Sequence, residues 1–526
     1  MRKVIRKADA VLPAPLSPGK AVLLTFCSAV LLTLAFPRPG LWPLAWAALI
    51  PLFFAIEAAG TKQSFFLGWL FGFLHHTGIA YWVFYAFYMN SNAGLIVSLL
   101  FLLVVIGGFG GLYSALFALA ARRVIRAGGP AAVQACAVAC CWVCLEYCRS
   151  HFLTDMPWEL LGHSQYPWTR LIQIADITGV YGLSLLIVLT NYALYSSLRN
   201  CRFKAAARAL ATPALLISAV LAYGSIRLVQ FPPVQEAPSQ DGDPVAVVQG
   251  SFPQHERWKP ETWELQLRTH LRLSREAVAQ GARVVVWPES SIQSYLQEKF
   301  PGPLLDFLRE YNIVCIIGAP RYEQRSAGYY TYYNAALLVD RSGIRDVHDK
   351  LHLLPFGEYF PLGFMDLLRL RYSGPRQYSP ADRFNLLHTP SGRMGVLICY
   401  EVIFPELARG FVMEGADILI NISNDAWFGR SSAHYQHFSM AVCTAASFKR
   451  PVLRAANTGI SGVIDAAGRP VSSLAPFTEG FLLYTPTPTG TITVYCRYGD
   501  LFAGLCFAAG LALLFIPKRF ARSRKR

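Results

Sequence analysis

The chain has 526 residues, of which 54% are hydrophobic and only 15% are charged. This composition is too apolar for an ordinary soluble enzyme and indicates an integral membrane protein. The formal net charge of +16 could suggest a nucleic-acid partner, but the basic residues form short clusters beside apolar segments, a pattern that positive-inside membrane topology explains. We therefore expect a membrane protein with no nucleic-acid partner.

Apolar stretches along the chain predict about eight membrane spans, because a helix needs roughly 20 apolar residues to cross a bilayer. The first stretch is expected to be a retained anchor, since it has no small-x-small cleavage site before Pro37 and a second span follows at once. The stretches lie at about 20–36, 41–58, 64–88, 93–121, 131–148, 171–198, 205–228 and 498–517.

The distribution of lysine and arginine predicts the orientation of these spans. If the amino terminus is cytoplasmic, the inward-facing ends carry far more basic residues than the outward-facing ends. Both termini are then cytoplasmic in a multi-pass protein of the bacterial inner membrane. We expect a bundle of seven helices over 1–228, a periplasmic catalytic domain over 229–496, and a last helix with a basic tail over 497–526.

Polar residues interrupt the predicted spans at Glu57, His75, His76 and Glu146. Such residues inside a membrane usually face the bundle interior or serve function. For the histidine pair we expect inward-facing hydrogen bonds, with a lipid or proton role as the alternative. Five cysteines in one apolar segment lack histidine or carboxylate partners at metal-ligand spacing, so we expect small packing residues and no metal. They are Cys136, Cys140, Cys141, Cys144 and Cys148.

From Asp243 onward, short β-branched runs alternate with helical ones, which predicts a layered α/β domain. No glycine-rich phosphate loop or nucleotide fingerprint is present in the sequence, so no cofactor is expected. The predicted strands are 245–248, 283–287, 313–318, 335–340, 397–399, 418–422, 451–455 and 460–464, and the predicted helices are 261–280, 303–311, one from Pro405 and one near 433–449.

Cys399 stands at the end of a continuous apolar run and directly before polar residues. This places it at the carboxyl end of a strand, facing a crevice. A thiol there needs a base and a group that stabilises developing negative charge. Glu289 ends a run of three valines upstream, and Lys350 lies in a strand and loop between them. We therefore predict a Cys-Glu-Lys triad.

The motifs around these residues resemble those of the nitrilase superfamily and, within it, of the apolipoprotein N-acyltransferases. They cover roughly two hundred residues, and it is their combination that is specific. They are Trp287-Pro288-Glu289, Lys350-Leu-His-Leu-Leu-Pro-Phe-Gly-Glu-Tyr359, Cys399-Tyr400-Glu401 and Asn424-Asp-Ala-Trp-Phe-Gly429. The resemblance implies the four-layer α-β-β-α sandwich of nitrilases.

The predicted chemistry is acyl transfer through a thioester. Glu289 removes the Cys399 proton, the thiolate attacks an acyl ester, and Lys350 stabilises the oxyanion. The resemblance implies a phospholipid donor, typically phosphatidylethanolamine, and an acceptor that is the α-amine of the diacylglyceryl cysteine at the amino terminus of an apolipoprotein. A site held over the outer leaflet suits two lipid substrates.

Four further residues match site positions of the resembled family. Glu358 is expected to orient the lysine or the base, or else to cap the turn at Gly357. Tyr400 and Glu401 are expected to shape the oxyanion pocket or orient the lysine, with plain packing as the alternative for Tyr400. Trp258 matches a tryptophan near the acyl entrance, although it could also be a core residue.

Two other segments carry weaker expectations. Asn424, Asp425 and Trp427 follow a strand and are expected mainly to define the fold, with direct substrate contact as the alternative. The aromatic loop 359–365 is a candidate lid that excludes water.

Two other functions fit parts of the pattern. A membrane-anchored nitrilase or amidase would use the same triad with water as the acceptor. A transporter or binding scaffold would have lost catalysis, against which the presence of all three triad residues counts.

Overall fold

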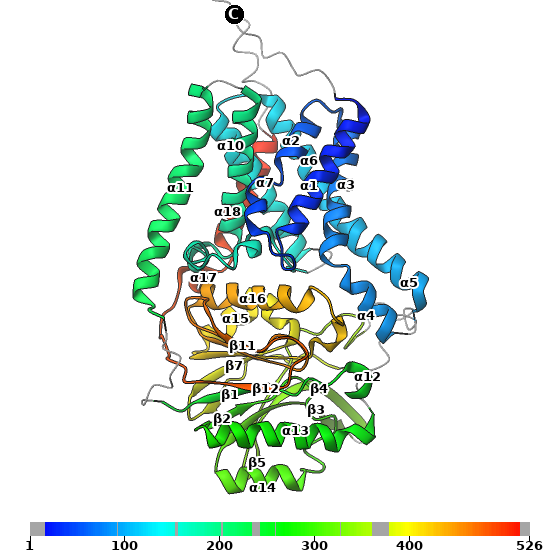
Figure 1. Cartoon of the computed structure of the whole chain (residues 1–526), viewed down its shortest axis with the longest axis vertical. Coiled ribbons are helices and arrows are strands. Elements are labelled where there is room, and N and C mark those ends of the chain that lie inside the picture. Colours follow the sequence, from blue (N-terminus) through cyan, green and yellow to red (C-terminus); the bar gives the residue numbers. More distant parts are fainter. Residues whose placement is uncertain are drawn as a thin grey trace, which may run out of the picture.

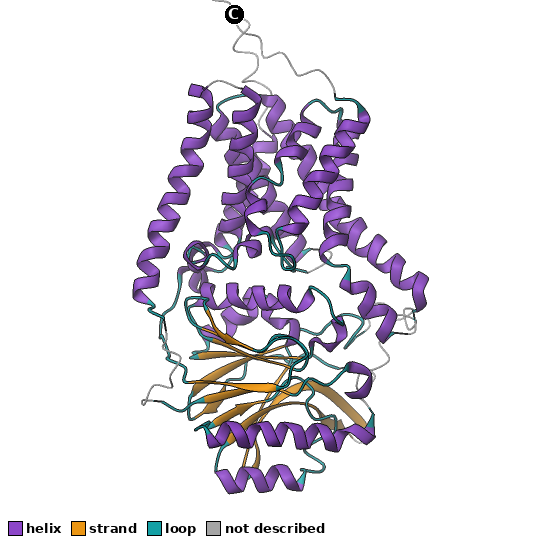
Figure 2. Ribbon diagram, viewed as in Figure 1, coloured by secondary structure: helices purple, strands orange, loops and turns teal. Residues whose placement is uncertain are grey.

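The computed structural model describes residues 16–91, 93–152, 156–200, 203–233, 242–257, 259–326, 328–359 and 378–515. A helical bundle and an α/β unit make up this part of the chain (Figure 1). Strands occur only in the α/β unit, as Figure 2 shows. The predicted combination of a helical membrane bundle and an α/β sandwich is confirmed.

Four helical stretches of the described residues are long and apolar enough to cross a membrane: Gly94–Ala127, Ala131–His151, Tyr181–Asn200 and Phe203–Gln230. Other apolar helices are shorter, so the total of eight spans stays a prediction. The bundle elements are α1 (Pro18–Leu34), η1 (Trp42–Trp46), α2 (Ile50–Glu57), α3 (Thr61–Ile79), α4 (Trp82–Asn90), α5 (Gly94–Leu100), η2 (Phe101–Gly108), α6 (Phe109–Ala127), α7 (Ala131–His151), η3 (Leu161–Gln165), α8 (Thr169–Ile172), α9 (Ala175–Thr178), α10 (Tyr181–Asn200), α11 (Phe203–Gln230) and α18 (Leu501–Phe515).

Two of the apolar stretches are divided in the structure. The stretch at 64–88 consists of most of α3 and most of the separate helix α4. The stretch at 171–198 begins with short helical turns and becomes a long helix only at α10, after Gly179 turns the chain with φ of 61°. Hydropathy does not report such breaks, because the residues on both sides of each turn are equally apolar.

Helices α3 and α6 approach closely along a line of small residues. A Cβ atom on Gly68 would lie 2.4 Å from the Cβ of Ala118, and one on Gly72 would lie 2.3 Å from the Oγ of Ser114. One on Gly110 would meet the ring of His76 at 2.3 Å. Small residues allow this approach in membrane bundles, where packing replaces the hydrophobic effect as the driving force.

The α/β unit contains two six-stranded sheets, with the orders β12-β1-β2-β3-β4-β5 and β11-β10-β9-β8-β7-β6. In each sheet the three central strands are parallel, so their carboxyl ends lie at one edge. The strands are β1 (Val245–Gln249), β2 (Val284–Val286), β3 (Val314–Ser326), β4 (Tyr329–Asp340), β5 (Gly343–Asp349), β6 (Leu387–Thr389), β7 (Gly392–Ile398), β8 (Ile418–Ser423), β9 (Val452–Ala456), β10 (Gly462–Ile464), β11 (Pro470–Ser473) and β12 (Gly480–Tyr484).

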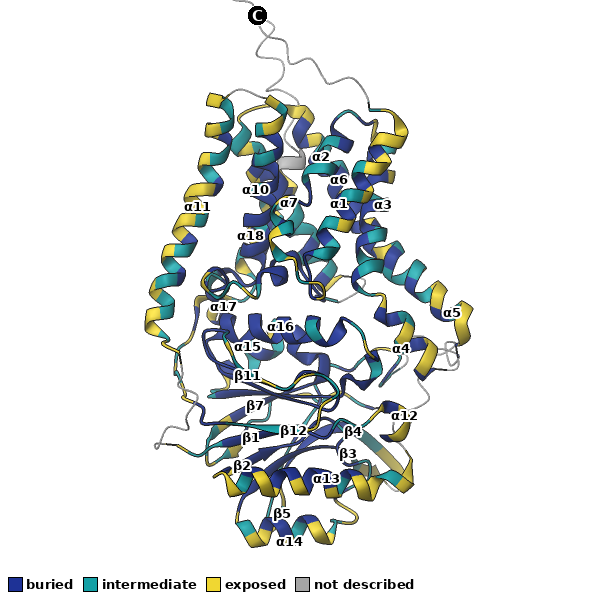
Figure 3. Ribbon diagram, viewed as in Figure 1, coloured by how far each residue is buried: buried dark blue, intermediate teal, exposed yellow. Residues whose placement is uncertain are grey.

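Helices cover the outer faces of both sheets and complete four layers. The helices α13 (Pro260–Ala279) and α14 (Gly302–Tyr311) lie at the end of the molecule away from the bundle, whereas α15 (Pro405–Met413) and α16 (Ala433–Phe448) lie between a sheet and the bundle (Figure 1). Nearly every side chain of α16 is buried (Figure 3). One side of this helix therefore packs against the sandwich and the other side packs against the bundle.

The structure extends the predicted strands and adds others. The hairpin of β3 and β4 extends beyond the predicted strands 313–318 and 335–340 and includes Arg321 and Glu323. These polar residues do not continue the apolar run on which the prediction was based. Strands β11 and β12 were not predicted, and β12 pairs with β1 although more than two hundred residues separate them. Their half-exposed side chains lack the continuous apolar run that marked the central strands.

Candidate active site

Cys399 follows β7 directly and begins the short turn η5 (Cys399–Ile403). Its φ is 60°, a left-handed value that costs a residue with a Cβ about 1–3 kcal/mol. Asn421 holds this conformation, because its Nδ2 donates to the carbonyls of Leu397 at 2.8 Å and Cys399 at 3.0 Å. The sharp turn places the thiol beyond the end of the strand, where the prediction placed a nucleophile.

Glu289 follows β2, and the surrounding residues fix both of its carboxylate oxygens. Oε1 accepts a hydrogen bond from Nδ2 of Asn334 at 2.8 Å, and Oε2 accepts one from the backbone N–H of Asn424 at 2.9 Å. Glu289 is 6% exposed and Cys399 is 4% exposed. The carboxylate is thus held in one orientation inside a covered site.

Lys350 follows β5 and lies between two carboxylates. Its Nζ is 2.9 Å from Oε2 of Glu358 and 3.6 Å from Oε1 of Glu289. Burial by itself lowers the pKa of Lys350, but Glu358 and then Glu289 outweigh it and raise the pKa overall. Lys350 is therefore a fixed cation at neutral pH.

The environment of Cys399 keeps its thiol protonated at rest. Burial raises the pKa of Cys399, the negative charge of Glu289 raises it further, and Lys350 acts in the opposite direction. A buried thiol of this kind needs a base to become a nucleophile. Lys350 thus lies beside Glu289, and the charges of both act on the Cys399 thiol.

Glu358 contacts both the lysine and the backbone of the turn that precedes it. Its Oε1 accepts from Nζ of Lys350 at 3.0 Å and from Nδ2 of Asn334 at 2.6 Å. Its Oε2 accepts from the backbone N–H of Leu354 at 2.7 Å.

Glu401 connects the segment that follows Lys350 to the end of β7, which precedes Cys399. It accepts hydrogen bonds of 2.7 to 2.8 Å from the backbone N–H groups of Leu351, His352 and Ile398. Burial raises the pKa of Glu401 to about 7 against the opposing charge of Lys350. This carboxyl group therefore connects two segments of the site through backbone hydrogen bonds.

Tyr400 also contacts the segment that follows Lys350. Its hydroxyl donates to the carbonyl of Leu353 at 2.6 Å, and Nζ of Lys350 lies 5.3 Å from the centre of its ring. The ring therefore adds a cation-π contact to the carboxylates that hold the ammonium group. Trp258 and residues 360–365 of the predicted lid lie outside the described residues.

Comparisons with known proteins match nearly the whole chain. The family of the apolipoprotein N-acyltransferase N-terminal domain matches residues 28–193, and the carbon-nitrogen hydrolase family matches residues 244–495. The chain is 37% identical to an apolipoprotein N-acyltransferase of Geobacter metallireducens over 95% of this chain and 96% of that protein. It is 33% identical to one of Methylococcus capsulatus, again over 95% and 96%. The chain belongs to the apolipoprotein N-acyltransferase family.

This membership supports acyl transfer over the alternative of a membrane-anchored hydrolase. Among solved structures, the chain is similar to a carbon-nitrogen hydrolase from Helicobacter pylori, with 17% identity, a TM-score of 0.34 and coverage of 46% of this chain and 89% of that one.

Asn334 is a site residue of this acyltransferase that the sequence analysis missed. Its side-chain amide donates to both Glu289 and Glu358. Its backbone carbonyl accepts a hydrogen bond from the backbone N–H of Lys350 at 2.9 Å. The available signal was a single amide at the start of the apolar run in β4, which by itself is too common to single out.

Asp425 forms a buried network behind Cys399. It accepts hydrogen bonds from the hydroxyl of Ser423 at 2.6 Å and from Nη2 of Arg454 at 2.6 Å, and it lies 3.1 Å from Nδ1 of His437. Burial opposes ionisation, but Arg454 and His437 hold the pKa of Asp425 well below its usual range. Asp425 therefore supports the strand end that carries Asn424.

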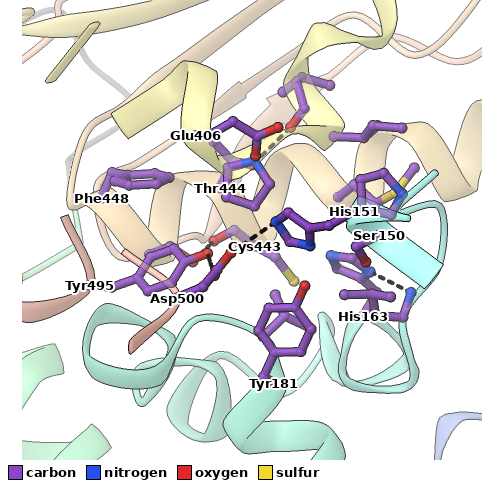
Figure 4. A pocket seen from close by; sticks show the side chains of 18 residues that line it. Ser150, His151, His163, Tyr181, Glu406, Cys443, Thr444, Phe448, Tyr495 and Asp500 are labelled. Carbon is purple, nitrogen blue, oxygen red and sulfur yellow. Dashed lines mark hydrogen bonds and ion pairs between the residues drawn. The ribbon is translucent and has the colours of Figure 1, made fainter. Parts of the chain in front are cut away.

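A pocket lies between the turn that carries Cys399 and the bundle (Figure 4). Among its lining residues, Asp500 accepts a hydrogen bond from the hydroxyl of Tyr495 at 2.7 Å and lies 3.4 Å from Nε2 of His151. Thr444 also lines the pocket and donates to the carbonyl of Val402, three residues after Cys399. Side chains of the bundle and of the sandwich thus line this pocket together, next to the turn η5.

The approach of β3 to Glu289 leads to a first prediction. A Cβ atom on Gly318 would lie 2.5 Å from both the Cα of Glu289 and the carbonyl oxygen of Pro288. These are backbone atoms, so Gly318→Ala should displace the base, which can cost about 10²-fold in rate for a shift of about 1 Å. The overpacking should also lower the free energy of unfolding by about 1–3 kcal/mol.

Steady-state acyl transfer and thermal unfolding of Gly318→Ala check both effects. Gly302→Ala is the matched control, since a Cβ on Gly302 meets nothing within 4 Å. Full activity in Gly318→Ala would contradict the importance of this close contact.

Proposed function

We propose that this enzyme transfers a fatty acyl chain from a phospholipid, with phosphatidylethanolamine as the expected donor, to the α-amine of the diacylglyceryl cysteine of an apolipoprotein. Cys399 is the nucleophile, Glu289 the base and Lys350 the oxyanion stabiliser. The observation that carries the proposal is the position of Lys350, a buried cation 3.6 Å from Glu289 whose charge also acts on the Cys399 thiol.

In the first half-reaction, Glu289 removes the thiol proton and the sulfur attacks the carbonyl carbon of the sn-1 ester. Lys350 stabilises the negative charge on the carbonyl oxygen. The carbon–oxygen bond to glycerol then breaks, the leaving oxygen takes the proton from Glu289, and a lysophospholipid departs. The acyl chain remains on Cys399 as a thioester.

In the second half-reaction, the neutral amine of the acceptor attacks the thioester. Glu289 takes a proton from the nitrogen and returns it to the departing sulfur, so the thiol is restored and an amide is formed. A thioester retains enough reactivity to acylate an amine, so no external energy source is required.

The contact between the site and the bundle supports access from the membrane. Phe356, two residues before Glu358, packs against Phe87 of α4 at 6.0 Å and Phe101 at 5.5 Å between ring centroids. Asn90 of α4 also donates to the carbonyl of Trp427. The loop that carries Glu358 therefore packs against α4. The next helix, α5, carries exposed apolar side chains, including Leu95 and Ile96.

We also propose the topology and boundaries expected from the sequence. The bundle covers 1–228, the catalytic domain covers 229–496 in the periplasm, and the last helix and cytoplasmic tail cover 497–526. The position of α16 between sheet and bundle is compatible with a catalytic domain resting on the outer face of an inner membrane.

The test is to incubate the purified protein with phosphatidylethanolamine labelled in the sn-1 chain, first alone and then with a diacylglyceryl peptide. The expected results are an intact-mass increase of one acyl chain on Cys399, followed by loss of that increase and acylation of the peptide amine. Release of free fatty acid without peptide acylation would overturn the proposal.

A further inference from the structure

Arg257 is a buried cation beside the catalytic base, and part of its hydrogen-bonding capacity is unused. It ends the short helix α12 (Gln254–Arg257) and is 1% exposed. Its Nη2 donates to the backbone carbonyls of Glu289 and Ser290. Its Nε and Nη1 have no hydrogen-bond partner among the residues that the structure describes. Buried guanidinium groups normally satisfy these donors with a carboxylate, a phosphate or water.

Among the described residues, no carboxylate lies within ion-pair distance of Arg257. Burial lowers the pKa of Arg257 to about 10, with Glu289 acting in the opposite direction, so the side chain remains charged at neutral pH. The positive charge is therefore only partly balanced by the protein, which favours binding of an anion at this place.

A second unused donor lies on the same helical turn. Gln254 is 5% exposed, and its Oε1 accepts a hydrogen bond from Nδ2 of Asn424 at 2.9 Å. That bond fixes the amide orientation, because Oδ1 of Asn424 in turn accepts from Asn457. Nε2 of Gln254 has no hydrogen-bond partner in the described part of the chain. Side chains three residues apart lie on the same side of a helix. Gln254 and Arg257 therefore present their unused donors from the same side of α12.

The position of α12 matches the geometry of a glycerophospholipid. Arg257 donates to the backbone carbonyl of Glu289, whose carboxylate serves the proposed triad, so the guanidinium group lies beside the residue that acts as the base. In the lipid, the sn-1 ester and the phosphate are joined to the two end carbons of one glycerol. The acceptor of the second half-reaction carries no phosphate in its diacylglyceryl group.

We propose that Arg257, assisted by Gln254, binds the phosphodiester of the phospholipid donor during the first half-reaction. This inference rests on the acyl transfer proposed above and adds a specificity determinant to it. The lipid phosphate, common to many headgroups, is recognised beside the base. Cys399 and Glu289 are themselves nearly covered in this structure, so any donor requires opening of the same region.

The experiment compares two acyl donors in Arg257→Gln. Phosphatidylethanolamine contains the phosphodiester, whereas the p-nitrophenyl ester of the same fatty acid does not. Loss of a hydrogen bond to a charged group should lower kcat/KM for phosphatidylethanolamine by about 10- to 100-fold more than for the ester. Arg257→Lys should recover part of this difference because it retains the charge. Once the ester has loaded the enzyme, transfer to a diacylglyceryl peptide should show no such difference.

Equal losses with both donors would overturn the proposal, because they would mean that Arg257 only supports the Glu289 turn. Arg268→Gln is the matched control, since Arg268 is exposed and pairs with Glu264 on the surface of α13. Failure of the wild-type protein to be loaded by phosphatidylethanolamine would instead contradict the proposed function.

A measurement on the wild-type protein covers the case in which Arg257→Gln does not fold. Glycerophosphoethanolamine should inhibit loading by the p-nitrophenyl ester more strongly than inorganic phosphate does. Equal inhibition by the two would show a site for free anions and overturn the assignment to a lipid, and no inhibition by either would overturn the site itself.

Discussion

Replacing Cys399 with alanine is expected to abolish thioester formation and peptide acylation. In enzymes with a nucleophile and a paired base, removal of the nucleophile lowers kcat by about 10⁶-fold. Glu289 and Lys350 would remain in place but would have no covalent intermediate to form or stabilise. Intact mass after incubation with labelled phosphatidylethanolamine measures the first effect, and peptide acylation measures the second.

The same substitution should leave the fold intact, which separates chemistry from stability. Alanine retains a Cβ atom, so the strain at φ of 60° is nearly unchanged, and the hydrogen bonds of Asn421 to the local carbonyls do not involve the thiol. Cys443→Ala is the matched control, because Cys443 is also a buried cysteine but lies on α16. An acyl adduct on the Cys399→Ala protein would show that the nucleophile lies elsewhere.

The positions of the three proposed triad residues could be predicted because Glu289 and Cys399 each follow a recognisable strand and Lys350 lies in a recognisable motif. The valine run before Glu289 and the apolar run before Cys399 mark central parallel strands, whose carboxyl ends must lie at one edge of a sheet. Placing Lys350 required the motif as well, since it follows the antiparallel strand β5. The structure brings these ends together from two sheets that face each other.

Other parts of the site depend on contacts between distant residues, which the local sequence does not encode. Asn334 links Glu289 to Glu358 across two strands, and Arg257 is buried although a lone arginine in a polar segment suggests an exposed helix end. The left-handed turn at Cys399 left no signal either, because glycine is the usual marker of positive φ. Helix breaks in the bundle were missed for another reason, because the residues on both sides of each turn are equally apolar.

Replacing Lys350 with methionine, which keeps most of the volume but removes the charge, should nearly eliminate both half-reactions. Loss of one group that stabilises an oxyanion costs about 10²–10³-fold in kcat. A second loss is expected because two nearly buried carboxylates, Glu289 and Glu358, would be left without the cation that lies between them and holds their positions. Rates of thioester formation and of transfer to the peptide, measured separately, should both fall.

The charge balance of this site also predicts the effect of Lys350→Met on stability and how to reverse it. Removing one partner of a buried ion pair typically costs about 3–5 kcal/mol, because the remaining charge is left uncompensated. Adding Glu358→Gln removes one of the two carboxylates, so the double variant should regain much of the thermal stability lost by Lys350→Met. It should regain no activity, since the oxyanion still lacks its cation. Near-normal turnover in Lys350→Met would refute the role of the lysine, and recovery of activity in the double variant would show that the lysine acts only by neutralising Glu358.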